Sequence, residues 1–156
     1  MLPLERYRTM CNFLYGCIDQ KAYDELFLRI SHEHGFVHGD LIRQKDMFFN
    51  PGLKGVCFRI TSNYCDCGTV LGGEDEKAGE LKTYVSWLKE LRKCQKHGMK
   101  AFYMMKFWEG GDSGERLKPM RVVNIEDVDV AFLAGIEEDR VYCIEYFKRH
   151  GEEYLQ

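Results

Sequence analysis

The sequence predicts an α+β fold in which three helices pack on one mixed or antiparallel sheet of about five strands. Short apolar runs of strand length alternate with stretches of helical periodicity, and glycines separate them. With 45% hydrophobic and 13% aromatic residues, the 156-residue chain can bury a substantial core. We expect a ferredoxin-like split βαβ core with a βαβ extension, or alternatively a three-layer α/β sandwich. Residues 1–156 are expected to form one domain, with 1–10 and 148–156 as peripheral tails.

The first strand is expected at Cys11–Ile18, an apolar and aromatic run of strand length. Asp19 follows it and is suited to cap a helix. From Asp19 to His34 apolar residues recur at three- and four-residue spacing, and Gly35 stands where a helix commonly ends. These apolar positions are Tyr23, Leu26, Phe27 and Ile30. The pattern predicts an amphipathic helix that packs on the sheet.

A second strand follows a long irregular connection. Residues 36–55 show no regular period because glycine and proline interrupt them. Val56, Phe58 and Ile60 then alternate with less apolar neighbours, which is typical of a half-buried strand. The polar segment after this strand, residues 64–68, carries two cysteines and is expected to form a turn.

The second helix is expected to follow Gly72-Gly73. Three consecutive carboxylates, Glu74 to Glu76, stand where the dipole of a helix N-terminus favours negative charge. The helix should extend to about His97, because Gly98 supplies a terminating residue. Its apolar face consists of Leu81, Tyr84, Val85, Leu88 and Leu91. Its basic face consists of Lys82, Lys89, Arg92, Lys93 and Lys96.

The remaining elements follow the same logic. Ala101–Trp108 is almost continuously apolar, which predicts a central strand covered on both faces. A glycine-rich loop at 110–114 leads to a short strand around Met120–Val123. Asn124 opens a third helix that stops at Gly135. Arg140–Phe147 is a last strand-forming run.

Composition limits the classes of partner. Twenty-two basic and twenty-five acidic residues give a net charge of -3, so the chain as a whole does not attract nucleic acid or an anionic membrane. No apolar stretch has the length of a membrane helix, and residues 1–10 lack the profile of a signal peptide. Five of the seven cysteines lie in apolar segments, which disfavours a disulfide framework. A cytoplasmic location is expected, and the oligomeric state is left open.

The most distinctive motif is Cys65-Asp66-Cys67-Gly68. Two thiols separated by one residue can supply two soft ligands to Zn²⁺, and a closed site needs two more. The histidines near the end of the first helix are the candidates for these, if the turn folds over that end. The predicted metal ligands are therefore Cys65, Cys67, His34 and His38. The alternative is a structural turn whose thiols bind no metal, so no cofactor is expected, with zinc as the possible exception.

The same thiol pair has a redox interpretation. A thiolate forms where backbone N–H groups or cations lower the pKa of a cysteine. Asp66 stands between the two thiols, and a carboxylate that close favours protonated sulfur. We therefore rank redox use of Cys65 and Cys67 below zinc binding.

A different chemistry is suggested by the run Met10–Gly16, MCNFLYG. Met-Cys followed by an apolar strand and glycine is similar to the start of class II glutamine amidotransferases, and the likeness covers about seven residues. In that family a cysteine made N-terminal by removal of methionine attacks an amide, with its own α-amino group as base. The resemblance implies an amidohydrolase with Cys11 as nucleophile if the mature chain begins at Cys11. The alternative is a buried strand thiol.

Two surface features are candidate binding sites. Lys89 and Lys93 on the basic helix face could contact phosphate or an acidic partner. Trp108 and Glu109 end the central strand at the glycine-rich loop, and loops at sheet ends often bind ligands. The chain has no Ser-His-Asp order, no HExxH and no nucleotide fingerprint. We therefore expect a small non-catalytic binding protein, such as a regulator, inhibitor or immunity-type partner, and alternatively a thiol- or zinc-dependent site.

Overall fold

A computed structural model describes residues 11–42, 55–73, 78–109 and 118–147. Its centre is a six-stranded mixed sheet with the order β2-β3-β1-β4-β6-β5. The strands are β1 (Cys11–Asp19), β2 (Leu41–Ile42), β3 (Gly55–Arg59), β4 (Ala101–Glu109), β5 (Arg121–Asn124) and β6 (Val141–Glu145). Only β5 and β6 pair in parallel, and the other four pairings are antiparallel. The predicted α+β class is confirmed, whereas the ferredoxin-like detail is not.

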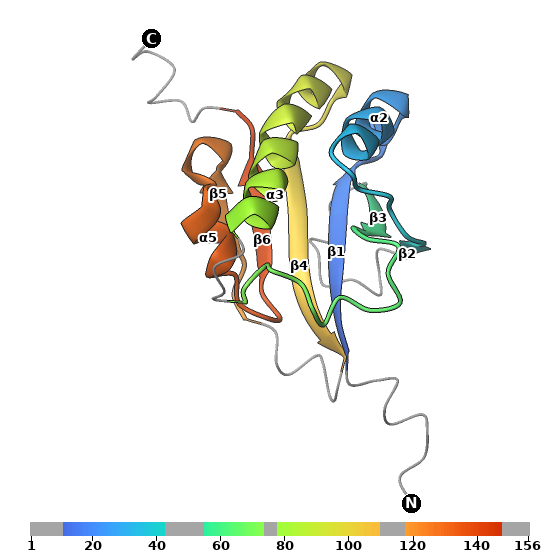
Figure 1. Ribbon diagram of the computed structural model, residues 1–156. Helices are drawn as coiled ribbons and strands as arrows, with labels where there is room; N and C mark the ends of the chain where they lie inside the picture. Colours follow the sequence, from blue (N-terminus) through green and yellow to red (C-terminus); the bar gives the residue numbers. More distant parts are fainter. Residues whose placement is uncertain (1–10, 43–54, 74–77, 110–117, 148–156) are drawn as a thin grey trace, which may run out of the picture.

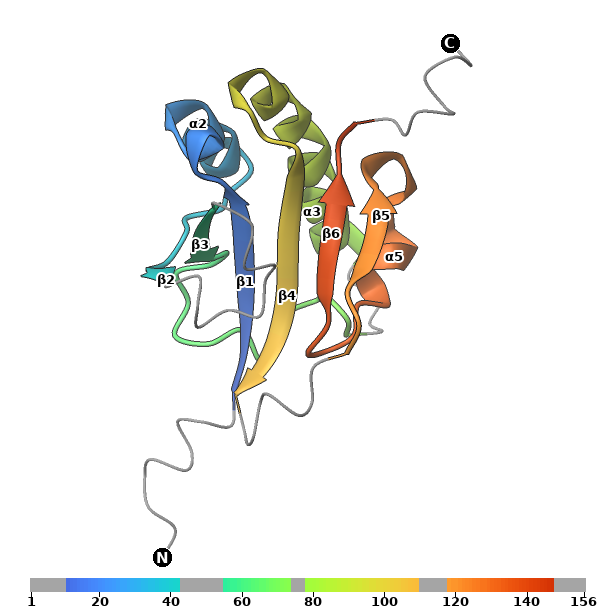
Figure 2. The ribbon, with the colours of Figure 1, turned by 180° about the vertical axis from the view of Figure 1, so that it is seen from behind.

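Three α-helices of the described ranges lie on one face of the sheet (Figure 1). They are α2 (Glu25–Glu33), α3 (Ala78–Glu90) and α5 (Val130–Ala134). The main core fills the space between these helices and the sheet, and both the helices and the strands contribute apolar side chains to it. The longest strands, β1 and β4, run side by side through the middle of the sheet (Figure 2). The position predicted for 101–108 is therefore confirmed.

Two predicted helices begin later than the sequence pattern indicated. The segment after β1 forms a 3₁₀ turn at Gln20–Ala22, and α2 starts only at Glu25. Asp24 caps α2, because its side chain accepts a hydrogen bond from the backbone N–H of Phe27. Asp129 caps α5 in the same way, after a second 3₁₀ turn at Ile125–Asp127. The caps assigned to Asp19 and Asn124 thus open short turns rather than the helices.

Helix α3 buries its apolar face against α2 and the sheet. Trp87, which the predicted face omitted, is fully buried, and its indole N–H donates to Ser31 Oγ at 3.1 Å. The helix changes to a 3₁₀ turn at Leu91–His97, and Gly98 ends it with a φ of 96°. The three carboxylates expected at its start lie outside the described residues, as do the loop at 110–114 and both tails.

The second face of the sheet carries a smaller apolar cluster. Its buried members are Cys17, Cys57, Met105, Phe107 and Val141. Figure 2 views this face, over which no helix of the described ranges lies. Strand alternation explains the division, because even-numbered residues of β1 such as Leu14 and Ile18 belong to the main core.

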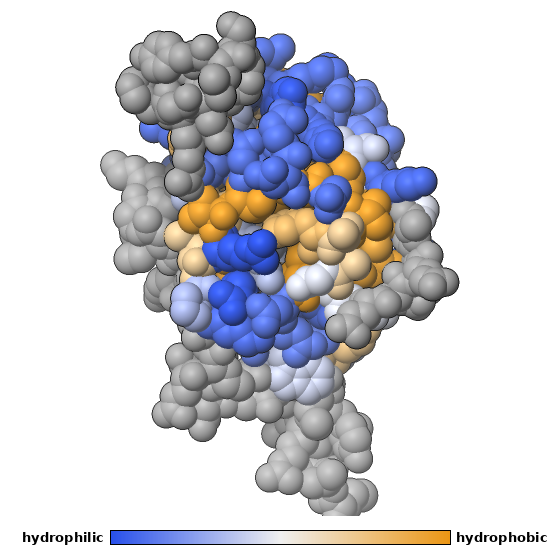
Figure 3. Space-filling view, turned by 90° about the vertical axis from the view of Figure 1, so that its left-hand side faces the viewer, coloured by the Kyte–Doolittle hydropathy of each residue, from blue (hydrophilic) through white to orange (hydrophobic). Residues whose placement is uncertain are grey.

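The outer side of β5 and α5 is partly apolar. Figure 3 shows a band of apolar side chains there between two polar regions. Met120, just before β5, and Val122, within β5, are among the exposed large apolar residues of the described ranges. None of the helices in these ranges combines the length and the apolar character that crossing a bilayer requires.

Candidate metal centre

The turn that carries Cys65 and Cys67 lies along the first half of β1. Strand β3 pairs with β1 only from Tyr15 onward, which leaves the backbone of residues 12–14 without a strand partner on that side. The chain after β3 fills this position. Ile60 N–H donates to the Leu14 carbonyl at 2.9 Å, and Asp66 N–H donates to the Asn12 carbonyl at 2.8 Å. The turn is thereby held against the start of β1.

Asp66 anchors this turn through its side chain. The residue is only 3% exposed, and its carboxylate accepts hydrogen bonds from Leu14 N–H at 2.9 Å and from the Thr61 hydroxyl. The Arg59 guanidinium neutralises the carboxylate at 3.1 Å and lies 4.8 Å from the Phe13 ring centroid. A buried carboxylate with these partners fixes the backbone on both sides of it. The cysteines at 65 and 67 are therefore displayed in a defined geometry.

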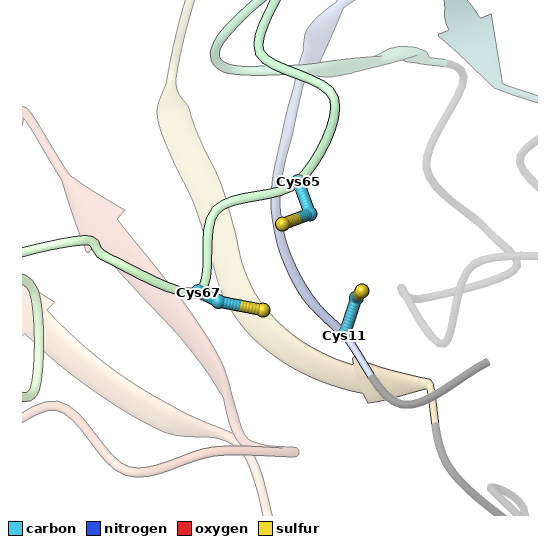
Figure 4. A group of neighbouring side chains, drawn as sticks. All are labelled: Cys11, Cys65 and Cys67. Carbon is cyan, nitrogen blue, oxygen red and sulfur yellow. The ribbon is translucent and has the colours of Figure 1, made fainter. Parts of the chain in front are cut away.

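Three sulfur atoms converge at this point. The Sγ atoms of Cys11, Cys65 and Cys67 all lie within 4.8 Å of one another. Figure 4 shows Cys11 at the beginning of β1, close to the turn that carries Cys65 and Cys67, with the Cys67 side chain extending toward β1. Cys67 is exposed, whereas Cys11 and Cys65 are half-buried. Asn12 N–H donates to Cys67 Sγ at 3.3 Å, which holds the exposed thiol toward β1.

The three thiols perturb one another. Burial raises the pKa of Cys11 to about 11, with further increases from the Cys67 and Cys65 sulfurs. The pKa of Cys65 is lowered, mainly by hydrogen bonds with the backbone and the thiol of Cys67. Asp66 raises the pKa of Cys65, as the sequence argument expected, but the hydrogen bonds from Cys67 outweigh it. The Asp66 carboxylate pairs with Arg59, and its effect comes last among the causes that act on Cys65.

The histidines predicted as ligands do not join this cluster. His34 Nδ1 donates to the Ile30 carbonyl at the end of α2, 2.8 Å away. His38 Nδ1 donates to the Ile60 carbonyl, also at 2.8 Å, and its ring stacks on Phe27 with centroids 5.3 Å apart. Burial lowers the pKa of His38, and the bond to Ile60 offsets this only in part. The third member of the described cluster is Cys11, which the sequence argument did not include among the ligands.

The predicted partner-binding residues lie in two places, along the α3 segment and at the end of β4, where Trp108 and Glu109 pair with Asn12 and Cys11 of β1. Lys89 and Lys93 are exposed, and Lys93 forms an ion pair with Glu90. Trp108 is half-buried in β4, where its backbone N–H donates to Asp139 Oδ1 at 3.0 Å. The side chain of Glu109 lies outside the described residues. Surface binding through these residues stays a prediction.

A polar cavity of about 300 Å³ adjoins the thiol turn. Cys65 and Asp66 line it from one side, and Glu80 and Tyr84 of α3 line it from the other. Burial raises the pKa of Tyr84 to about 12, so this phenol is neutral at physiological pH. The cavity therefore places polar groups of the turn and of α3 around a shared space.

The site can hold a soft cation. Thiolate sulfurs are the ligands that Zn²⁺ and other thiophilic ions prefer. Sequence reasoning identified two of the three clustered thiols from their spacing, but it placed Cys11 among buried strand thiols. Strand alternation places Cys11 on the same face of β1 as Cys17. The residues near Cys11 in the sequence do not indicate that the turn at 64–68 lies beside it.

Comparison with protein-family models, with curated proteins and with solved structures finds no match for this chain.

Proposed function

We propose that this protein binds one thiophilic metal ion, zinc in the first instance, through Cys11, Cys65 and Cys67. The observation that carries the proposal is the convergence of three Sγ atoms within 4.8 Å. Ligands about 2.3 Å from a shared zinc ion stand roughly 4 Å apart in a tetrahedron, so a small inward movement of the sulfurs would suffice.

The arrangement around the sulfurs supports this proposal. Two ligands come from a turn anchored by a buried Asp66, and the third comes from the neighbouring strand. Ligands pre-positioned by packing lose less entropy when the ion binds. Zinc takes four ligands, so a fourth donor, from protein or solvent, completes the coordination. The ion would join residue 11 to residues 65–67, two segments far apart in the sequence.

Metal analysis tests the proposal directly. The full chain is purified under reducing conditions and equilibrated with excess Zn²⁺, and the metal retained after gel filtration is measured by mass spectrometry. We expect about one equivalent. Replacement of zinc by Co²⁺ should give sulfur-to-cobalt charge-transfer bands and the intense visible bands of tetrahedral cobalt. Retention of less than about a tenth of an equivalent by the reduced protein would overturn the proposal.

Single substitutions assign the ligands. Cys11→Ser, Cys65→Ser and Cys67→Ser should each weaken Co²⁺ binding by more than about 100-fold, beyond the loss typical of an outer-shell partner. Cys94→Ser is the matched control, because this thiol is buried elsewhere in the core. His34→Gln and His38→Gln test the histidines and should leave the cobalt spectrum unchanged. A spectrum lost with either histidine would return the site to the ligand set predicted from sequence.

A metal site is compatible with a non-catalytic interaction protein. A bound ion of this kind would order the surface around the exposed Cys67. The role as a binding protein, expected from the sequence, stays a prediction. The hypothesis that Cys11 is the nucleophile of an amidohydrolase also stays a prediction. The intact mass of the protein would show whether its mature chain begins at Cys11.

A further inference from the structure

Apart from the cluster of three thiols, two further cysteines meet on the face of the sheet opposite the helices. Cys17 of β1 and Cys57 of β3 stand directly opposite each other in the antiparallel ladder, and their Sγ atoms lie 2.8 Å apart. Cα atoms of opposed residues in such a ladder are about 4.5–5.5 Å apart, which lies within the range that disulfides span. A bond of about 2.05 Å therefore requires the sulfurs to move by less than about 1 Å.

We propose that Cys17 and Cys57 form a reversible cross-strand disulfide when the protein meets hydrogen peroxide. This modification goes beyond the proposed metal site, with which it shares no residue. The sequence argument against a disulfide framework rested on the apolar segments in which five of the seven cysteines lie. It could not show that two of them face each other across a pair of strands.

The chemistry uses one peroxide for each bond. The Cys57 thiolate attacks one peroxide oxygen, the O–O bond breaks, and the leaving hydroxide takes up a proton to become water. The sulfur of Cys17 then attacks the Cys57 sulfenic acid. The S–S bond forms, the S–O bond breaks, and the hydroxide leaves as water with the Cys17 proton. Two thiols thus lose two electrons and two protons, and one peroxide becomes two waters.

The local environment gives the two thiols different roles. The sulfur–sulfur hydrogen bond lowers the pKa of Cys57 and raises that of Cys17, so Cys57 is the first to ionise. Both residues are almost fully buried, with exposures of 0% and 1%. Reaction therefore needs a small neutral oxidant or a brief opening of β3, and the bond once formed is shielded from bulky reductants.

Oxidation should stabilise the fold. The bond closes a loop between positions 40 residues apart, which restricts the unfolded chain. We expect the Tm of the oxidised protein to rise by several degrees and to return on reduction. The metal-free protein should respond in the same way, because the pair lies outside the thiol cluster.

Peptide mapping tests the proposal in the Cys11→Ser variant. Trypsin releases residues 9–21 and 55–59, and in this variant each peptide contains a single cysteine. Metal-free protein is treated with hydrogen peroxide, and the remaining thiols are alkylated in denaturant before digestion. We expect one linked product that joins these two peptides. Cys94→Ser added to the same background should still give this product, whereas Cys57→Ser should abolish both the product and the rise in Tm.

A second experiment removes burial as an obstacle. The reduced and unfolded variant is refolded in a glutathione redox buffer, in which every thiol is accessible while the chain folds. The 9–21 to 55–59 link should again dominate. The proposal is overturned if both cysteines stay free in peroxide and in the redox buffer. It is also overturned if Cys57 links to other cysteines as often as to Cys17.

Discussion

At the scale of single residues, Asp66 determines the geometry of the thiol turn. Its carboxylate joins Leu14 of β1, Thr61 of the connection and Arg59 of β3, so one buried group holds three segments together. The sequence identified Asp66 as the residue between two cysteines, but its neighbours suggested only an electrostatic effect on sulfur. Its structural role depends on a backbone N–H that becomes available where β3 ends.

Replacement of Asp66 should weaken both the fold and the metal site. Asp66→Asn removes the counter-charge of Arg59 and replaces one acceptor oxygen by an amide nitrogen. We expect this change to cost about 3 kcal/mol in the free energy of unfolding. Metal affinity should also fall, by about 10- to 100-fold, as for other residues that orient ligands. Urea unfolding and cobalt titration measure the two effects. Asp127→Asn, an exposed carboxylate, should stay within about 0.5 kcal/mol of the wild type.

We expect the stability of the folded protein to fall in mild acid because of His38. Burial lowers its pKa in the folded protein below the ordinary value of 6.5, so the unfolded chain binds the proton more readily. Stability from this residue is present above about pH 6.5 and decreases as the pH falls toward the lower folded pKa. We expect the urea midpoint to be lower at pH 5 than at pH 7, and this difference should shrink in His38→Gln. His32→Gln, at an exposed site, should keep the wild-type pH dependence; an equal change in both variants would contradict the assignment.

At the scale of elements, local patterns predicted type and order well. The strands at β1, β3, β4, β5 and β6 and the three helices all lie where periodicity indicated them, because alternation and helical spacing are properties of neighbouring residues. The starts of the first and third helices were less accurate, since each offered more than one residue suited to capping. Asp24 and Asp129 cap the actual helices, and the chain uses the earlier residues to enter a 3₁₀ turn.

Substitution by alanine should affect stability differently at Gly68 and Gly72, two glycines close to the thiol turn. Gly72 has a φ of 68°, and a Cβ there would lie 2.2 Å from the Ile136 carbonyl oxygen. Gly68 has no atom within 4 Å of such a Cβ, and its φ is not positive. We therefore expect Gly72→Ala to cost at least about 2 kcal/mol in unfolding free energy, whereas Gly68→Ala stays within about 0.5 kcal/mol. Equal unfolding midpoints for the two variants would show that the 69–73 segment adapts.

At the scale of the whole molecule, strand order decides which cysteines meet. Neither the 11–65–67 cluster nor the 17–57 pair follows from spacing, because both depend on the antiparallel register of β3 against β1. Register is set by the match of all apolar side chains across a sheet, which is information distributed along the chain. The sequence therefore identified the cysteine-containing turn but assigned it the clustered histidines at the end of the first helix rather than the thiol at the start of the neighbouring β1.

Because the proposed ion joins the start of β1 to the turn after β3, metal binding should raise global stability. An ion that binds only the folded state adds RT ln(1 + [L]/Kd), which is about 2.7 kcal/mol at a hundredfold excess over Kd. We expect Zn²⁺ to raise the Tm of the reduced protein in calorimetry and a chelator to reverse the change. The shift should disappear in Cys67→Ser, an exposed residue whose substitution leaves the core packing intact, and persist in Cys94→Ser. A shift of equal size in Cys67→Ser would place the stabilising ion elsewhere in the chain.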